Sequence, residues 1–130
     1  MVNILLVSHS IEIAKGTKEL AEQMKQGAVE IIAVGGTEAG DLGTNPDAIE
    51  SAVNEIDKSD GLIILADLGS AVMSVNMVLD WLDDEVREKI HLANAPFVEG
   101  AVIAAVESGM GNSMEEILSS IESAEIIKKK

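Results

Sequence analysis

The stretch Val2-Asn3-Ile4-Leu5-Leu6-Val7-Ser8-His9-Ser10 decides the fold, because a short apolar run passes directly into a polar tripeptide. The six residues 2–7, which are apolar except for Asn3, are typical of a strand buried in a parallel sheet. In open α/β sheets, ligands bind beyond the carboxyl ends of the strands, where loops and helix N-termini expose backbone N–H groups. An imidazole at such a place, between two hydroxyl residues, is positioned for chemistry rather than for packing.

The rest of the chain alternates strand and helix signals without a linker or a repeat, which predicts one domain over residues 1–130. Further strands are predicted at residues 29–34, 62–66 and 89–93, and Ile126 with Ile127 indicates a short final strand at an edge. Helices are predicted between and after the strands. Their expected N-terminal signals are Ser8 or Ser10, Asn45-Pro46, Ser70, and the capping box of Ser113 with Glu116.

Repeated βα units predict an α/β fold with a mostly parallel sheet and helices on both faces. With the usual strand order 2-1-3-4, the first and third strands are neighbours. The third strand is followed by Asp67-Leu68-Gly69-Ser70. We therefore expect His9 and Asp67 to face each other at one edge of the sheet.

Two sets of apolar residues are expected to lie in the core because they recur at helical spacing. The first helix carries Ile13, Thr17, Leu20 and Met24, and the third carries Met73 and Met77 one turn apart. With 47% hydrophobic but only 2% aromatic residues, the core must be aliphatic.

Composition excludes several classes of function. A net charge of −14 would repel phosphate backbones and anionic lipid, so we expect neither nucleic-acid nor membrane partners. The chain contains no cysteine and no long apolar segment near its N-terminus, which favours a soluble, cytoplasmic protein without disulfides or thiolate metal sites. The only basic run, residues 128–130, is expected to be a solvated tail.

A histidine beside an aspartate has a defined chemistry. A carboxylate that accepts a hydrogen bond from one ring N–H fixes the tautomer and leaves the other nitrogen with an exposed lone pair. That nitrogen is a nucleophile near neutral pH, and its attack on a phosphoryl group would give a phosphoimidazole. Backbone N–H groups around Ser8, Ser10, Gly69 and Ser70 are candidates for binding the phosphoryl oxygens, and no metal is required.

Other interpretations of these residues remain open. His9 alone could be a turn or capping residue, and His91 is expected to be a partly exposed residue of an edge strand. A receiver-like domain would use Asp67 as phosphoacceptor but needs an acidic pair after the first strand. A hydrolase built on Ser70, His9 and Asp67 lacks the G-x-S-x-G nucleophile motif, and no complete nucleotide-binding motif occurs. A non-catalytic interaction module is the remaining alternative.

Three motifs together resemble a known family: Val-Ser-His-Ser at residues 7–10, Gly-Gly-Thr-Glu-Ala-Gly-Asp-Leu-Gly-Thr at 35–44, and Asp-Leu-Gly-Ser-Ala at 67–71. In order and spacing the chain resembles, over essentially its whole length, the phosphotransfer subunit of the phosphoenolpyruvate-dependent dihydroxyacetone kinase. That subunit is related to the mannose-type enzyme IIA domains of the sugar phosphotransferase system. Sugar-transport relatives usually carry Ser-His-Gly and a Gly-Gly-Ser-Pro stretch, whereas this chain has Ser-His-Ser and Gly-Ser-Ala-Val.

The resemblance implies a mannose-type enzyme IIA fold and a phosphotransferase function with a phosphohistidine intermediate. His9 matches the histidine that accepts a phosphoryl group from the phosphocarrier HPr, and Asp67 matches the aspartate that orients it. Ser70 falls where relatives place groups near the phosphate. The implied partners are HPr and the ADP-binding and dihydroxyacetone-binding kinase subunits; ADP stays on the partner, so this chain binds no cofactor itself. A homodimer is also expected from the family, and a mannose-type sugar-transport component is the nearest rival function.

Overall fold

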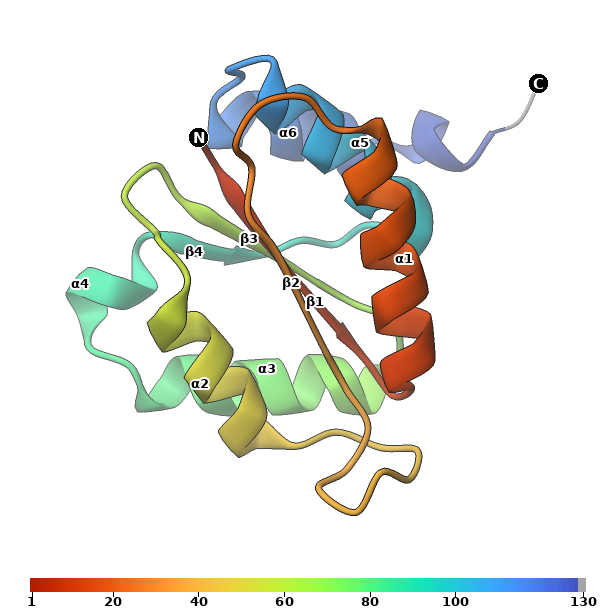
Figure 1. Cartoon of the computed structure of the whole chain (residues 1–130). Coiled ribbons are helices and arrows are strands. Elements are labelled where there is room, and N and C mark those ends of the chain that lie inside the picture. Colours follow the sequence, from red (N-terminus) through yellow and green to blue (C-terminus); the bar gives the residue numbers. More distant parts are fainter. Residues whose placement is uncertain (129–130) are drawn as a thin grey trace.

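A parallel sheet with the strand order β2-β1-β3-β4 forms the centre of the molecule (Figure 1). The computed structural model describes residues 1–128, and within them the sheet has four strands. They are β1 (Asn3–Ser8), β2 (Ile31–Gly35), β3 (Leu62–Ala66) and β4 (Ile90–Leu92). The predicted fold class and strand order are therefore confirmed. Of the basic run at residues 128–130, the last two lie outside the described residues.

Two groups of helices cover the two faces of the sheet (Figure 1). One face packs against α1 (Ile11–Met24), α5 (Phe97–Gly109) and α6 (Met114–Ile121), and the other against α2 (Pro46–Glu55) and α3 (Gly69–Trp81). The one-turn helix α4 (Asp84–Arg87) lies between α3 and β4, and the 3-10 helix η1 (Ala124–Ile127) follows α6. No helix within residues 1–128 has both the length and the apolar character needed to cross a bilayer.

The continuous apolar run of β1 is explained by burial on both faces. Ile4 and Leu6 belong to the core under α1, α5 and α6, whereas Leu5 and Val7 belong to the core over α2 and α3. All four side chains are fully buried. Successive side chains of a strand point to opposite faces, so this central strand contributes to both cores and its residues 4–7 are all apolar.

The expected core face of α1 is wrong. Ile13, which is 51% exposed, lies with Leu20 and Met24 on the solvent side, and only Thr17 of the predicted set is buried. The buried face consists of Ala14, Thr17 and Ala21. Helix α5, against which α1 packs, also buries mainly small residues. Small side chains let two helices approach closely, so here size rather than hydrophobicity selects the buried face.

The expectation that Met73 and Met77 pack in the core is also wrong. Met73 is 70% exposed and Met77 is exposed as well, while Val75, Val78 and Leu79 of α3 are buried. Apolar residues lie nearly all around this helix, and a pattern without a polar face cannot reveal which side meets the sheet.

Most predicted helix starts are confirmed, but the cap predicted at Ser70 and the strand predicted at residues 126 and 127 are wrong. The side chains of Ser10, Asn45 and Ser113 each accept a hydrogen bond from the first turn of α1, α2 and α6. Ser70 does not cap α3, because the helix already begins at Gly69 and no side chain caps it. The final strand expected from residues 126 and 127 is absent from the described chain; they form η1, whose first turn is capped by Ser123.

Gly109, in the last turn of α5, permits a close contact between α5 and the end of α1. A Cβ atom added there would lie 2.1 Å from the Gln26 carbonyl oxygen, a backbone atom that cannot swing away. We expect Gly109→Ala to lower the free energy of unfolding by about 2–3 kcal/mol, as overpacked cores do.

Gly16→Ala is the matched control, because a Cβ at this exposed position in α1 meets nothing within 4 Å. It should instead stabilise by about 0.5–1 kcal/mol. Urea denaturation of both variants measures the difference, and equal effects would contradict this packing argument.

Candidate active site

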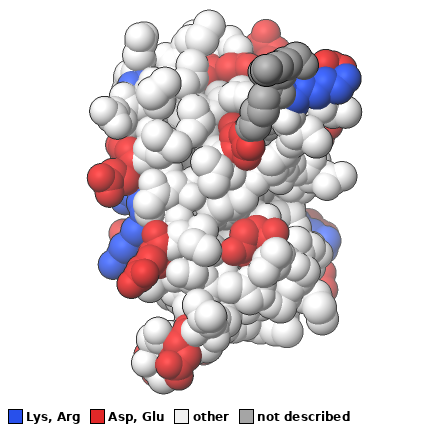
Figure 2. Space-filling model, turned by 90° about the vertical axis from the view of Figure 1, so that its right-hand side faces the viewer, with Lys and Arg blue, Asp and Glu red and all other residues white. Residues whose placement is uncertain are grey.

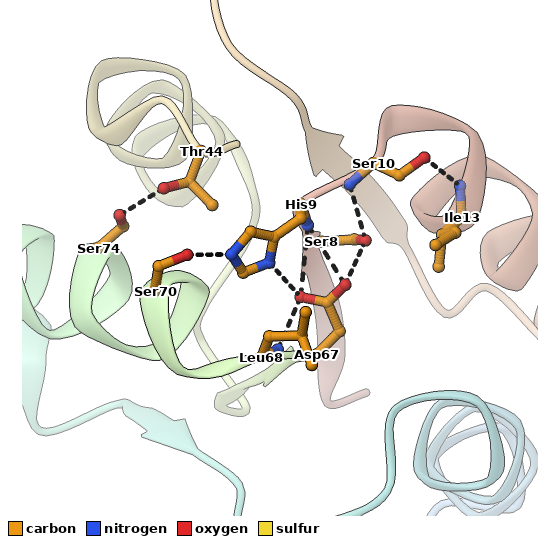
Figure 3. Close-up of polar contacts among 9 residues, drawn as sticks. All are labelled: Ser8, His9, Ser10, Ile13, Thr44, Asp67, Leu68, Ser70 and Ser74. Atoms are coloured by element: carbon orange, nitrogen blue, oxygen red, sulfur yellow. Dashed lines mark hydrogen bonds and ion pairs between the residues drawn. The ribbon is translucent and has the colours of Figure 1, made fainter. Parts of the chain in front are cut away.

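The ends of β1 and β3 bring a histidine and an aspartate together. Val7 pairs with Ala66 in the sheet, and His9 and Asp67 follow the ends of β1 and β3 at the same edge. His9 Nδ1 lies 3.0 Å from Asp67 Oδ1 (Figure 3). The two predicted residues therefore contact each other directly. Their side chains are 23% and 14% exposed, so the pair is partly shielded but open to an approaching group.

The Asp67 carboxylate accepts hydrogen bonds from several donors at once. The Ser8 hydroxyl donates to Oδ2 at 2.6 Å, and the Leu68 N–H donates to Oδ1 at 2.8 Å. The backbone N–H of His9 lies 3.3 Å from both oxygens. Donors that converge in this way stabilise the ionised form of a carboxyl group.

The protonation state of Asp67 follows from these contacts. Burial raises the pKa of its carboxyl, but the hydrogen bonds from the Ser8 hydroxyl, from the His9 ring and backbone, and from the Leu68 N–H lower it. Together they hold the pKa below the ordinary value of 3.8. Asp67 is therefore a carboxylate at neutral pH and can only accept hydrogen bonds.

The tautomer of His9 is set by this carboxylate. Because Asp67 can only accept, Nδ1 must carry the hydrogen of the bond between them, and the neutral ring then has its lone pair on Nε2. Nε2 contacts the Ser70 hydroxyl on the first turn of α3 (Figure 3). The nitrogen available for nucleophilic attack is thus the one that points toward α3.

The other residues predicted to contact phosphate lie in two different environments. Ser8 is fully buried, and its Oγ accepts the N–H of Ser10 at 3.1 Å. The N–H groups of His9 and Ser10 are thus already engaged inside the protein. Gly69 and Ser70 are exposed at the start of α3, whose N-terminal dipole favours an anion.

The loop of residues 36–45 between β2 and α2 also contacts the site, although no functional role was predicted for it. The Gly43 N–H donates to the His9 carbonyl at 2.8 Å, and Thr44 is hydrogen-bonded to Ser74 of α3 at 2.6 Å (Figure 3). Gly43 has φ +140°, a conformation that side chains disfavour. The cluster of glycines in this loop was the only available signal of such a constraint.

The second histidine lies away from this site. His91 is on the edge strand β4, as expected, and its Nε2 is 3.3 Å from Glu122, whose carboxylate also accepts the Asn94 N–H. Its side chain is exposed. It therefore offers a natural control for His9.

Charge alone does not attract an anion to this protein. The chain carries 23 acidic and nine basic residues, and the side of the molecule on which α1 lies shows acidic groups and only a few basic ones on a largely uncharged surface (Figure 2). Any phosphoryl oxygens at His9 must be bound by local N–H and O–H dipoles.

Comparison with known proteins identifies the family. A sequence model of the family described as "PTS system fructose IIA component" matches residues 3–118. The chain belongs to this family. The solved structure of EF1359, described as a protein of unknown function, is similar to this chain with a TM-score of 0.86 and 40% identity, covering 93% of this chain and 92% of that one.

Relatives of the IIA domain with 35–42% identity carry more specific names. The "PEP-dependent dihydroxyacetone kinase 2, phosphoryl donor subunit DhaM" of Listeria innocua is 42% identical, covering 91% of this chain and 94% of the relative. The "PTS-dependent dihydroxyacetone kinase, phosphotransferase subunit DhaM" of Lactococcus lactis is 35% identical, with 92% of each covered. A DhaM of Providencia stuartii is 37% identical over 95% of this chain, which spans only 27% of that protein. These relatives support a phosphotransfer role.

Proposed function

We propose that this chain is a phosphoryl carrier that accepts a phosphoryl group from phospho-HPr on His9 Nε2. It then passes the group to ADP bound on the ADP-binding subunit of a dihydroxyacetone kinase. The observation that carries the proposal is the contact between His9 Nδ1 and a carboxylate held ionised by its other donors. The names of the relatives support the choice of dihydroxyacetone over a transported sugar.

The accepting step needs no external base. The Nε2 lone pair forms a bond to phosphorus while the P–N bond of the donor phosphohistidine breaks, and the donor imidazole keeps that electron pair. The His9 ring then carries a positive charge, because Nδ1 retains its hydrogen. The Asp67 carboxylate at 3.0 Å stabilises this charge.

The donating step reverses these changes. An oxygen of the ADP β-phosphate forms a bond to phosphorus, the N–P bond breaks, and the ring leaves as neutral imidazole with Nδ1–H still donated to Asp67. In both steps the Ser70 hydroxyl, which contacts free Nε2, must turn to make room for the phosphoryl group. There it can donate to a phosphoryl oxygen, beside the N-terminal N–H groups of α3.

The experiment is intact-mass measurement after incubation with phosphoenolpyruvate, enzyme I and HPr, followed by addition of the ADP-loaded kinase subunit. We expect one acid-labile phosphoryl adduct that requires HPr and disappears, with formation of ATP, when the ADP-loaded subunit is added. An adduct that this subunit cannot discharge would favour the sugar-transport role instead. No adduct would overturn the carrier function.

A further inference from the structure

Ser8 occupies a position from which it can act only through Asp67. Its side chain is fully buried at the end of β1, and its hydroxyl lies 2.6 Å from Asp67 Oδ2, the oxygen not in contact with the imidazole ring. A side chain with no exposed surface cannot touch a phosphoryl group or a partner protein.

The direction of the Ser8 hydrogen bonds is determined by their partners. The Ser10 N–H donates to Ser8 Oγ at 3.1 Å, and Asp67 is an ionised acceptor (Figure 3). The Ser8 hydroxyl hydrogen must therefore point at Oδ2. Because the Ser8 side chain is fully buried, its hydroxyl is shielded from water, and a hydrogen bond between a hydroxyl and a carboxylate is among the stronger ones in proteins.

We propose that Ser8 is a positioning residue for phosphoryl transfer: its buried hydroxyl fixes the rotation of the Asp67 carboxylate that presents Oδ1 to His9 Nδ1. This inference rests on the proposed role of His9. It assigns Ser8 to the side of the carboxylate remote from the phosphoryl group, in place of the phosphate contact expected from the sequence.

The remaining contacts of Asp67 cannot replace this hydroxyl. Without it, Oδ2 keeps only the His9 backbone N–H at 3.3 Å, a long contact that the same N–H shares with Oδ1. The carboxylate can then rotate, and the Nδ1–H tautomer of His9 loses part of its stabilisation. A ring that spends time as the Nε2–H tautomer has no lone pair at the nitrogen that must attack.

The test compares Ser8→Ala with Ser108→Ala, a matched control that also removes the hydroxyl of a fully buried serine. Ser108, in α5, donates its hydroxyl hydrogen to the Val2 carbonyl and has no hydrogen bond with Asp67. Ser8→Thr keeps the hydroxyl in a strand position that favours β-branched residues. Each variant is measured for thermal stability, for single-turnover phosphorylation across a range of phospho-HPr concentrations, and for the His9 tautomer by ¹⁵N NMR of the ring.

We expect Ser8→Ala to lower the maximal single-turnover rate about tenfold, as loss of a hydrogen bond to a charged group does. The half-saturating concentration of phospho-HPr should stay within about twofold, because Ser8 touches no partner. The NMR spectrum should show a mixture of tautomers, whereas Ser8→Thr and Ser108→Ala should resemble the wild type in rate and in tautomer.

Two results would overturn the role of Ser8: a Ser8→Ala rate within twofold of the wild type, or equal losses in Ser8→Ala and Ser108→Ala. The second would mean that the loss of any buried serine hydroxyl slows the reaction. Failure of the proposed function is distinguishable from both, because the wild type itself would then take up no phosphoryl group.

Discussion

His9→Gln is expected to take up no phosphoryl group from phospho-HPr. Glutamine keeps a polar group of similar reach, but an amide nitrogen has no lone pair available for attack, so the nucleophile is removed and little else changes. The side chain is partly exposed and belongs to neither hydrophobic core, so the variant should fold with nearly the stability of the wild type. Intact mass after incubation with the phosphoenolpyruvate system measures the loss.

The chain provides its own control for this experiment. Its only other histidine is His91, which is exposed on β4 and paired with Glu122. His91→Gln should be phosphorylated at the wild-type rate. If His9→Gln were still labelled and His91→Gln were not, the phosphoacceptor would be His91 and the proposed mechanism would be wrong.

Asp67→Asn is expected to lower the rate of phosphoryl acceptance by roughly a hundredfold while leaving the protein folded. An amide offers one acceptor oxygen where the carboxylate offers two, and its NH₂ must face either the Ser8 hydroxyl or the His9 ring. If it faces the ring, it donates to Nδ1 and moves the hydrogen to Nε2. If it does not, the cation formed on phosphorylation still lacks its counter-charge. Rapid-quench kinetics with phospho-HPr measures the rate.

Asp80→Asn is the matched control for the loss of one negative charge. Asp80 lies near the far end of α3, is largely exposed, and pairs with Arg87 at 3.5 Å. Its replacement should leave the rate within about twofold of the wild type, since salt screens an exposed charge at the far end of α3 from His9. Equal losses in the two variants would mean that net charge, and not the contact with His9, determines the rate.

The fold could be predicted from the sequence because local signals agreed with one another. The apolar run of β1, the turn residues after each strand, and the helix starts at Asn45 and Ser113 all predicted the same alternating pattern. The order of strands is the usual one for such repeated βα units, as predicted. Since parallel strands end at one edge, the contact between His9 and Asp67 followed as well.

The rest depended on side-chain size and on long-range hydrogen bonds. The buried face of α1 consists of small residues such as Ala14 and Ala21, and hydrophobic periodicity gives them less weight than Ile13. The contacts of Ser8 with Asp67 and of Gly43 with His9 join residues 59 and 34 positions apart in the sequence, and only the folded chain reveals them. The sequence could predict the contact between His9 and Asp67 but not the residues that hold the two side chains in place.

The pairing of β1 with its neighbours has a consequence for how this protein tolerates change. Val7 is matched to Ala66 and Ser8 to Gly35, so His9 is the first residue beyond the paired part of β1. Inserting or deleting one residue within β1 would shift the His9 imidazole by about 3.3 Å and turn it to the opposite face of the sheet. The length of the buried strand β1 therefore determines where His9 lies relative to Asp67.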